Sequence, residues 1–263
     1  MSTDKEASPP AVTVILPLHN HAQWIGGAIS SVVDQDYPNK RIIVVDDGST
    51  DNSAEAVMDL LDGTKTPSNQ GEPKVCHGTV RGSDTGLMLC RFQEARGPSF
   101  ARNWGLKVGW DGADVFTFLD SDDEYLAGKI SKSVAKWLEA PESIGVIFSD
   151  YDTLNNSGLR LRQYKEPYSR QRLFQECLAN ADSLISKAAF EKCGFFDENL
   201  RVAEDYDFWL RAAEHFILVH IPESLLTIRV GEHSSSSQVP SEIWQQNYGR
   251  VMQKAQERAR GQA

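Results

Sequence analysis

The stretch VTVILPLHNHAQWIGGAISSVVDQDYPNKRIIVVDDGSTDNS, residues 12–53, places a segment of helical spacing between two short apolar runs. VTVILPL (12–18) and RIIVVDD (41–47) are rich in β-branched residues and continuously apolar, as is typical of strands buried on both faces. WIGGAISSVVDQ (24–35) gathers its apolar residues on one side, as an amphipathic helix does. The stretch therefore predicts a strand-helix-strand unit and an α/β fold built on a mainly parallel sheet.

The same alternation continues toward the C-terminus. Apolar runs predict strands at 87–92, 114–120 and 144–151, and helical spacing predicts helices at 53–61, 100–110, 129–140, 169–178, 185–194 and 204–216. Residues 62–86 are rich in Gly, Pro, Ser, Thr and Asn, so we expect a loop there. Residues 159–165 alternate like an exposed strand, and the tail at 241–263 is predicted to be a polar helix with a thin apolar stripe.

Composition limits the classes of function. The chain has 263 residues, of which 40% are hydrophobic and 24% charged, as in a folded globular domain. Its formal net charge of -10 disfavours binding to nucleic acid, because a negative surface repels the phosphate backbone. No apolar run reaches the ~20 residues that a transmembrane helix needs, and the N-terminus has no apolar signal segment. We therefore expect a cytoplasmic protein, and its 4 cysteines, which lack C-x-x-C spacing, should be free thiols.

Two of the predicted strands end in acidic clusters. VVDDGSTDNS (44–53) contains the end of one strand and FLDSDD (118–123) the end of another. The carboxyl ends of parallel strands share one edge of a sheet, and ligands bind at that edge, so we expect both clusters there. Each cluster alone also fits a simpler interpretation, in which Asp47 belongs to a turn and Asp122 and Asp123 begin a helix.

The second cluster brings Asp120, Asp122, Asp123 and Glu124 into five positions. Like charges at this density raise one another's pKa unless a cation compensates them, and Mg²⁺ or Mn²⁺ prefers oxygen ligands. The i, i+2 spacing of Asp120 and Asp122 places both on one side of an extended segment, with Asp123 pointing away. The chain matches no EF-hand loop and no P-loop, and it contains no G-x-G. The cluster therefore predicts a divalent cation that is bound together with substrate phosphates.

EDYDFWLRAAEHF (204–216) is predicted to be a strongly amphipathic helix. At about 100° per residue, Asp205 lies in line with the apolar stripe and Glu204 lies at its edge. A carboxylate on an apolar stripe is costly unless it faces a cleft or a partner. Asp205 is therefore a candidate general base, or else an acid that caps or pairs at the start of the helix.

Together with GPSFARNWGL (97–106), these motifs occur in the order seen in inverting glycosyltransferases of family 2, which the chain resembles over roughly residues 11–235. The resemblance implies the GT-A nucleotide-diphospho-sugar transferase fold, a Rossmann-like sheet flanked by helices with a smaller acceptor-side region. It implies donor-binding roles for Pro17, His19, Asn20, Asp47, Arg102, Asn103, Asp120 and Ser121. It makes Asp122 a metal ligand, with Asp120 and His233 as further candidates. It makes Asp205 the catalytic base, and Glu204 its neighbour in acceptor binding or support.

The resemblance also implies an organisation and an activity. Residues 1–10 would be a flexible N-terminus, 11–123 the nucleotide-sugar-binding half, 124–235 the acceptor and catalytic half of the same domain, and 236–263 a helical tail. The activity would be metal-dependent, with Mn²⁺ or Mg²⁺, and would move a hexosyl or N-acetylhexosaminyl group with inversion. UDP is the expected nucleotide, and the acceptor would be a hydroxyl of a glycan or lipid-linked acceptor in polysaccharide, lipopolysaccharide or capsule synthesis. His19 departs from the aromatic residue that the family commonly carries at this position.

Other classes of protein fit part of the pattern. A nucleotidyltransferase on a related sheet would also use acids and a metal, a glycosidase would use paired carboxylates, and a non-catalytic carbohydrate-binding domain would need neither. The basic residues of the tail, Arg250, Lys254, Arg258 and Arg260, could contact anionic lipid at the inner face of the membrane or a second copy in a homodimer, or face solvent. His233 could equally be an exposed loop residue.

Overall fold

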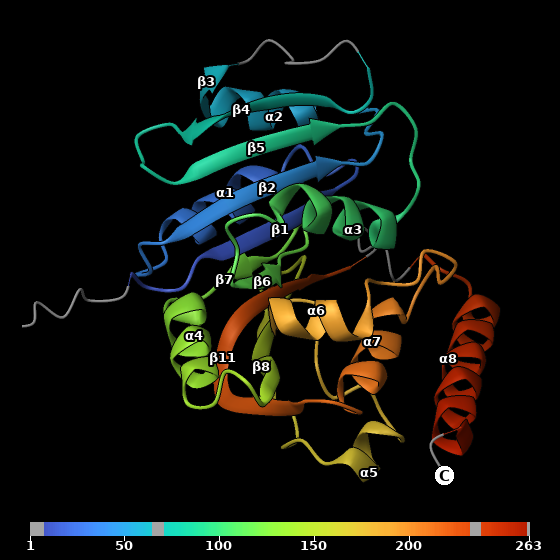
Figure 1. The fold of residues 1–263 in the computed structure, drawn as a ribbon. Helices are drawn as coiled ribbons and strands as arrows, with labels where there is room; N and C mark the ends of the chain where they lie inside the picture. The colour runs from blue at the N-terminus through green and yellow to red at the C-terminus, as the bar shows by residue number, and fades with distance from the viewer. Residues whose placement is uncertain (1–7, 65–70, 232–237, 262–263) are drawn as a thin grey trace, which may run out of the picture.

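The structure is a computed structural model that describes residues 8–64, 71–231 and 238–261. Within these residues eleven strands form one sheet in the order β3-β4-β5-β2-β1-β6-β10-β8-β11-β7, with β9 paired to β8 (Figure 1). The strands are β1 (Val12–Leu18), β2 (Lys40–Asp46), β3 (Leu61–Thr64), β4 (Lys74–Val80), β5 (Gly86–Arg91), β6 (Val115–Phe118), β7 (Glu124–Tyr125), β8 (Ile144–Asn155), β9 (Arg160–Gln163), β10 (Leu184–Ser186) and β11 (Ile217–Val230). The helices are α1 (Ile25–Val33), α2 (Ser53–Leu60), α3 (Pro98–Gly109), α4 (Lys129–Leu138), α5 (Arg170–Leu173), α6 (Lys187–Cys193), α7 (Glu204–Ala212) and α8 (Ser241–Gly261). The predicted α/β class is confirmed.

Four neighbouring strands, β5, β2, β1 and β6, run parallel. β1 is buried along its whole length, as its continuous apolar run predicts. It pairs with β2 from Val12 opposite Lys40 to Leu18 opposite Asp46. The carboxyl ends of these strands therefore share one edge, and both acidic clusters follow strands that end there.

The sheet as a whole is mixed rather than mainly parallel. Beyond the four parallel strands, β8 pairs with β11 in parallel, but the remaining pairings of the described residues are antiparallel. The reversal in the middle of the sheet comes from β10, a strand of three residues between β6 and β8. The boundary expected near residue 123 thus falls within one continuous sheet.

The sequence did not predict strands β3, β4, β7, β10 and β11, of which β4 and β11 are the two longest. The expected loop at 62–86 is wrong for Lys74–Val80, which is β4 and pairs with β3 and β5 in antiparallel order. A Cβ atom on Gly78 would lie 2.8 Å from Gly63 Cα, so glycine is required where the two backbones meet. β11 is the second of these two, and its pairing with β8 shifts register between Ile221 and Ser224, around Pro222.

Helices cover both faces of the sheet. Helices α1, α2 and α4 pack in one hydrophobic cluster, whereas α6, α7 and α8 pack in another with Leu106 of α3. In Figure 1, α3 and α6 lie in front of the sheet and α1 lies behind it. The buried residues Val251 and Ala255 attach α8 to the second cluster, so the predicted tail helix is packed along one side.

Glycine brings α3 close to the central strands. A Cβ atom on Gly105 would lie 3.1 Å from Cγ1 of Ile15 in β1, and closer still to its Cγ2 methyl group. A Cβ atom on Gly109 would lie 2.8 Å from Cδ1 of Ile43 in β2. This approach sets Arg102 and Asn103, both buried in the first half of α3, beside the carboxyl edge of the sheet.

Two further sequence predictions concern membrane-spanning helices and the cysteines. None of the described helices is long and apolar enough to cross a membrane. All the cysteines, Cys76, Cys90, Cys177 and Cys193, are free thiols, as predicted. Burial raises the pKa of Cys90 to about 11, so this thiol is poorly nucleophilic in the folded protein.

Candidate active site

The acidic stretch after β6 turns sharply at the carboxyl edge. The amide of Asp123 donates to the carbonyl of Asp120 at 2.9 Å, which closes the turn. The side chain of Asp120 is 45% exposed, whereas those of Asp122 and Asp123 are buried. The three carboxylates leave the turn toward different elements: Asp120 contacts α3, Asp122 lies near the start of α1, and Asp123 contacts β11.

Arg102 forms ion pairs with carboxylates from two parts of the fold. Its buried guanidinium donates from Nη2 to Asp120 Oδ1 at 2.8 Å and from Nη1 to Glu204 Oε1. Burial alone would lower the pKa of Arg102, but the negative charges of Asp120, Glu204 and Asp205 outweigh burial and raise it. Arg102 therefore stays cationic and joins the end of β6 to the start of α7.

The first turn of α7 carries Glu204 and Asp205. It follows Ala203, which holds the left-handed conformation at φ 62° and ψ 21°, and this conformation redirects the chain into the helix. Oδ1 of Asp205 accepts from the amide of Tyr206 at 2.7 Å, and Asp205 takes part in none of the ion pairs of the described residues. Burial raises the pKa of Asp205, and burial raises that of Glu204 to about 7, although Arg102 opposes both shifts.

Asp122 lines a cavity of about 530 Å³. Its Oδ1 lies 3.8 Å from Nδ1 of His21, and the same nitrogen lies 2.7 Å from Oγ of Ser121. Burial raises the pKa of Asp122, and the nearby Asp120 raises it further. The other lining residues come from the segment before α1, the end of β8 with the turn that follows it, and the end of β11 with the next residue: Gln23, Trp24, Leu154, Asn155, Asn156, Gly158, Arg229, Val230 and Gly231.

The residues at the ends of β1 and β2 that were predicted to contact the donor form hydrogen bonds between neighbouring loops in the structure. The carboxylate of Asp47 accepts from the amides of Arg96 at 2.9 Å and Gly97 at 2.7 Å. Nδ1 of His19 lies 2.8 Å from the Asp47 carbonyl oxygen, and Oδ1 of Asn20 accepts from the amide of Thr50 at 2.8 Å. These bonds set the shape of the edge on which a donor would lie.

The remaining predicted residues are placed as follows. Pro17 is buried in β1 opposite Val45. Asn103 joins α3 to the segment before α7, because its side chain exchanges hydrogen bonds with the backbone of Phe196 at 2.9 and 3.0 Å. Ser121 lies against His21. His233 falls outside the described residues. Its role as a ligand stays a prediction.

A divalent cation at this edge would need ligands from the substrate in addition to those of the described residues. In the described part of the chain, no group of three or more His, Cys, Asp or Glu is arranged to hold a metal ion. Asp120 is engaged by Arg102, whereas Asp122 lines the cavity, so Asp122 is the carboxylate that can turn toward a ligand. Mg²⁺ and Mn²⁺ sites of this kind keep one or two carboxylates and take the rest of their ligands from phosphates and water.

Two residues of the site were missed by the sequence analysis. His21, to which the sequence analysis gave no role, is 8% exposed and contacts Ser121. Arg229, at the end of the unpredicted β11, donates its amide to Asp123 at 2.9 Å and its Nη2 to Glu124 at 2.5 Å. The run TIRV before His233 was the available signal, because it places an arginine at the end of an apolar strand.

The family model for glycosyl transferase family 2 matches residues 13–197, a range that contains the turn after β6 and Arg102. The chain belongs to glycosyl transferase family 2. Curated relatives include UDP-Glc:alpha-D-GlcNAc-diphosphoundecaprenol beta-1,3-glucosyltransferase WfgD of Escherichia coli, 28% identical over 148 residues that cover 56% of this chain and 48% of WfgD. The chain spans 31% to 58% of the length of uncharacterised rickettsial glycosyltransferases that it matches at 25% to 28% identity.

Solved structures show that this family 2 chain has the GT-A fold. TarS of S. aureus in complex with UDP-GlcNAc aligns with a TM-score of 0.71 at 19% identity, covering 93% of this chain and 66% of TarS. The mannosyltransferase PcManGT from Pyrobaculum calidifontis, in complex with GDP-Man and Mn2+, aligns with a TM-score of 0.62 at 19% identity, covering 88% of this chain and 60% of PcManGT. The fold expected from the sequence is confirmed.

Proposed function

We propose that this chain transfers a sugar from a nucleoside-diphosphate donor to a hydroxyl group of an acceptor, with inversion at the anomeric carbon. The proposal rests on one observation: Arg102 holds the first turn of α7 beside the turn after β6. Arg102 joins Asp120 and Glu204 there, and Asp205 is the neighbouring carboxylate outside the ion pairs. Family membership and the named activities of the relatives support the same reaction.

Asp205 is the base in this proposal. Its carboxylate would take the proton of the acceptor hydroxyl while the hydroxyl oxygen forms a bond to the anomeric carbon. The bond from that carbon to the diphosphate breaks on the opposite face, and the nucleoside diphosphate leaves with the electron pair. Because burial raises the pKa of Asp205, this carboxylate is a stronger base than an exposed aspartate. Holding donor and acceptor together removes the entropy of their encounter from the barrier.

Asp122 is the proposed ligand of a divalent cation, Mn²⁺ or Mg²⁺, with His233 as a further candidate. When bound, such a cation offsets the charge on the diphosphate and stabilises it as a leaving group. Arg229 lines the same cavity as Asp122, and its guanidinium pairs with Glu124 at 2.5 Å. Asp120, held by Arg102, is then the residue proposed to contact the donor ribose.

UDP is the first nucleotide to test, because TarS is described in complex with UDP-GlcNAc and WfgD is named for UDP-Glc. GDP is the second, since PcManGT is described with GDP-Man. The name of WfgD includes a sugar on diphosphoundecaprenol, and we propose a glycan or a lipid-linked acceptor of this kind. Contact with a membrane surface and dimerisation through α8 stay predictions.

Calorimetry tests the donor and cation site. We expect UDP to bind in the presence of Mn²⁺, and Asp122→Ala to abolish the Mn²⁺-dependent part of that binding. Asp36→Ala is the control, because Asp36 is exposed and follows α1 at the opposite edge of the sheet. If Asp122→Ala binds UDP and Mn²⁺ as the wild type does, the assignment of Asp122 is wrong.

Turnover tests the base. Asp205→Asn should retain UDP binding and lose release of UDP from the nucleotide sugar that the wild type uses. Glu242→Gln is the matched control. Like Asp205, Glu242 is an acid in the first turn of a helix, but it is exposed on α8 and is not one of the proposed site residues. Loss of UDP binding in Asp205→Asn would indicate a structural acid. Binding without turnover in the wild type would favour a carbohydrate-binding domain.

A further inference from the structure

Lys254 of α8 contacts two carboxylates that flank the start of α7. Its Nζ lies 3.0 Å from Oδ2 of Asp197 and 2.7 Å from Oδ1 of Asp207. The Asp207 side chain is 1% exposed and that of Lys254 is 36% exposed, so the ammonium group reaches a buried carboxylate from the rim of the interior. The segment between the two carboxylates, residues 198–206, contains Glu204 and Asp205. A single ammonium group therefore holds both ends of the segment that carries the proposed base.

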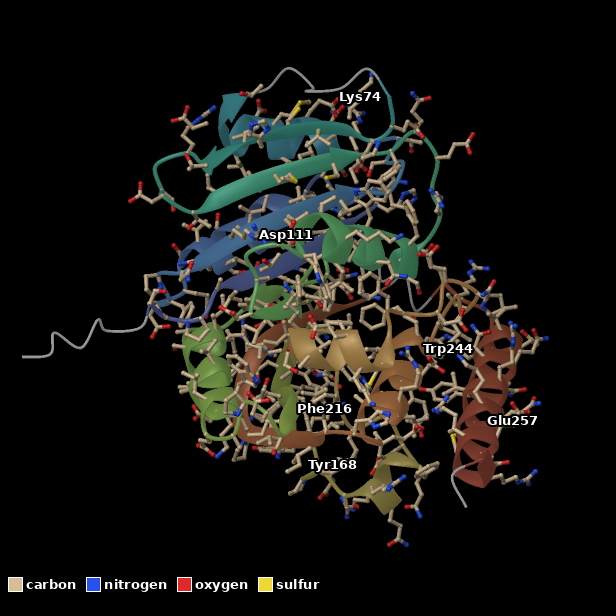
Figure 2. The ribbon with its side chains drawn as sticks, viewed as in Figure 1. Lys74, Asp111, Tyr168, Phe216, Trp244 and Glu257 are labelled. Atoms are coloured by element: carbon tan, nitrogen blue, oxygen red, sulfur yellow. The ribbon has the colours of Figure 1, made fainter. Side chains whose placement is uncertain are left out.

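Other residues of α8 contact the same segment between these ends. Asn247, which is buried, donates from Nδ2 to the carbonyl of Val202 at 3.3 Å. The rings of Tyr248 and Tyr206 lie 5.6 Å apart between centroids. Figure 2, which labels Trp244 and Glu257 on α8, shows side chains filling the space between this helix and the body of the protein.

The segment needs such support because its backbone is strained. Ala203 holds the left-handed conformation at φ 62°, which is unfavourable for a residue with a Cβ atom. A strained residue keeps its conformation only where the surrounding structure determines it. Asn247 holds the carbonyl that precedes Ala203, and Lys254 holds Asp207 in the first turn of α7.

We propose that α8 positions the first turn of α7, and that Lys254 is the residue through which it sets Asp205 relative to Arg102. Lys254 is a positioning residue: it acts through Asp197 and Asp207 and contacts no reacting atom. The role of Asp205 as base rests on the proposed function, whereas the hold on residues 198–206 does not. The tail helix is thus part of the catalytic unit.

The chain offers a matched pair of variants. Lys254→Met removes the ammonium group and keeps the length of the side chain, and Asp207 retains Arg211, whose Nε lies 2.9 Å from its Oδ2. Arg258→Met also removes one cation of α8, but Arg258 pairs with Glu214, beyond the end of α7. A merely structural role of α8 predicts equal behaviour of the two variants.

Hydrogen exchange of peptides from residues 198–206 measures the hold directly. We expect faster exchange in Lys254→Met than in the wild type, no change in Arg258→Met, and recovery in Lys254→Arg. Turnover of Lys254→Met should fall by ~10- to 100-fold in kcat with the donor KM and UDP affinity unchanged, because displacement of a catalytic group by about 1 Å costs rate rather than binding.

Two results would overturn the proposal. Exchange of residues 198–206 that is unchanged in Lys254→Met would show that Lys254 does not hold the segment. Equal losses of kcat in Lys254→Met and Arg258→Met would show that α8 acts through general stability. If the wild type turns over no nucleotide sugar, the proposed function fails, and the exchange measurements alone then decide whether Lys254 holds the turn.

Discussion

Gly105→Ala tests the close approach of α3 to β1 that places Arg102 at the edge of the sheet. The added Cβ would lie 3.1 Å from Cγ1 and 3.3 Å from Cβ of Ile15, where carbon atoms ordinarily stay ~3.5–4 Å apart. Ile15 is fully buried and β-branched in a central strand, so it cannot rotate away. The helix must therefore move outward, and Arg102, one turn earlier, moves with it.

The expected magnitude follows from two opposing effects. Alanine in a helix interior is favoured over glycine by ~1 kcal/mol, whereas overpacking a core costs ~1–3 kcal/mol. Gly249→Ala provides the control, because Gly249 lies in the middle of α8 with nothing within 4 Å of the added Cβ. We expect Gly105→Ala to unfold in urea with a free energy ~1–3 kcal/mol below that of Gly249→Ala.

The double variant Ile15→Ala/Gly105→Ala sharpens this test. Removing the Ile15 side chain makes room for the new Cβ, so the two substitutions should be less destabilising together than the sum of their separate effects. Equal stability of Gly105→Ala and Gly249→Ala, or strict additivity of the double variant, would refute the close packing of α3 on β1.

Three further predictions concern buried charges and a thiol. Lys129 and Asp182 form a buried ion pair. Lys129→Met leaves the carboxylate of Asp182 buried without its partner, so it should lower the free energy of unfolding in urea by ~3–5 kcal/mol. A loss below ~1 kcal/mol would show that water reaches this ion pair in the folded protein. Burial raises the pKa of Cys90 to about 11, so a thiol reagent at about pH 8 should modify it only after unfolding, and fast labelling of the native protein would disprove this. Burial raises the pKa of Glu204 from 4.5 to about 7, so its contribution to stability is greatest below about pH 4.5 and is lost as pH rises through about 7. Glu204→Gln should flatten the decline in unfolding free energy over that range, and an unchanged pH profile would show that Glu204 is ionised throughout.

The strand-helix-strand core was predictable because its sequence signals are local. β1, α1 and β2 fall within residues 12–46, and each shows the apolar periodicity of its own type of structure. The acidic clusters at 44–53 and 118–123 were predicted to share one edge, and they do so because β2 and β6 both run parallel to β1. The resemblance to family 2 rested on the same motifs, and the family match confirms it.

Strands β4 and β11 were not predictable because their signals depend on the strands that they pair with. β4 contains Gly78, which local rules associate with loops, yet the glycine is needed where β3 and β4 meet. β11 contains Pro222 and Glu223, which interrupt its apolar run where the register shifts. A strand that gains its stability from pairing far along the chain leaves little trace in its own composition.

The different directions in which the side chains of Asp120 and Asp122 point were also not predictable. Spacing placed Asp120 and Asp122 on one side of an extended segment, but the chain turns after Asp120 and sends them to α3 and toward α1. The partners that draw them apart, Arg102 and His21, lie in other motifs. Lys254 was considered as a surface cation, because no local pattern links it to Asp197 and Asp207.

The short strand β10 has a mechanical consequence. It is hydrogen-bonded to β6 on one side and to β8 on the other, so the strands before and after the boundary expected near residue 123 belong to one continuous sheet. A hinge requires a connection that can bend without breaking such bonds, and the sheet offers none between these strands. We expect the two halves to melt in a single transition and substrates to enter through rearrangement of the connections at the carboxyl edge, with no rotation of one half against the other.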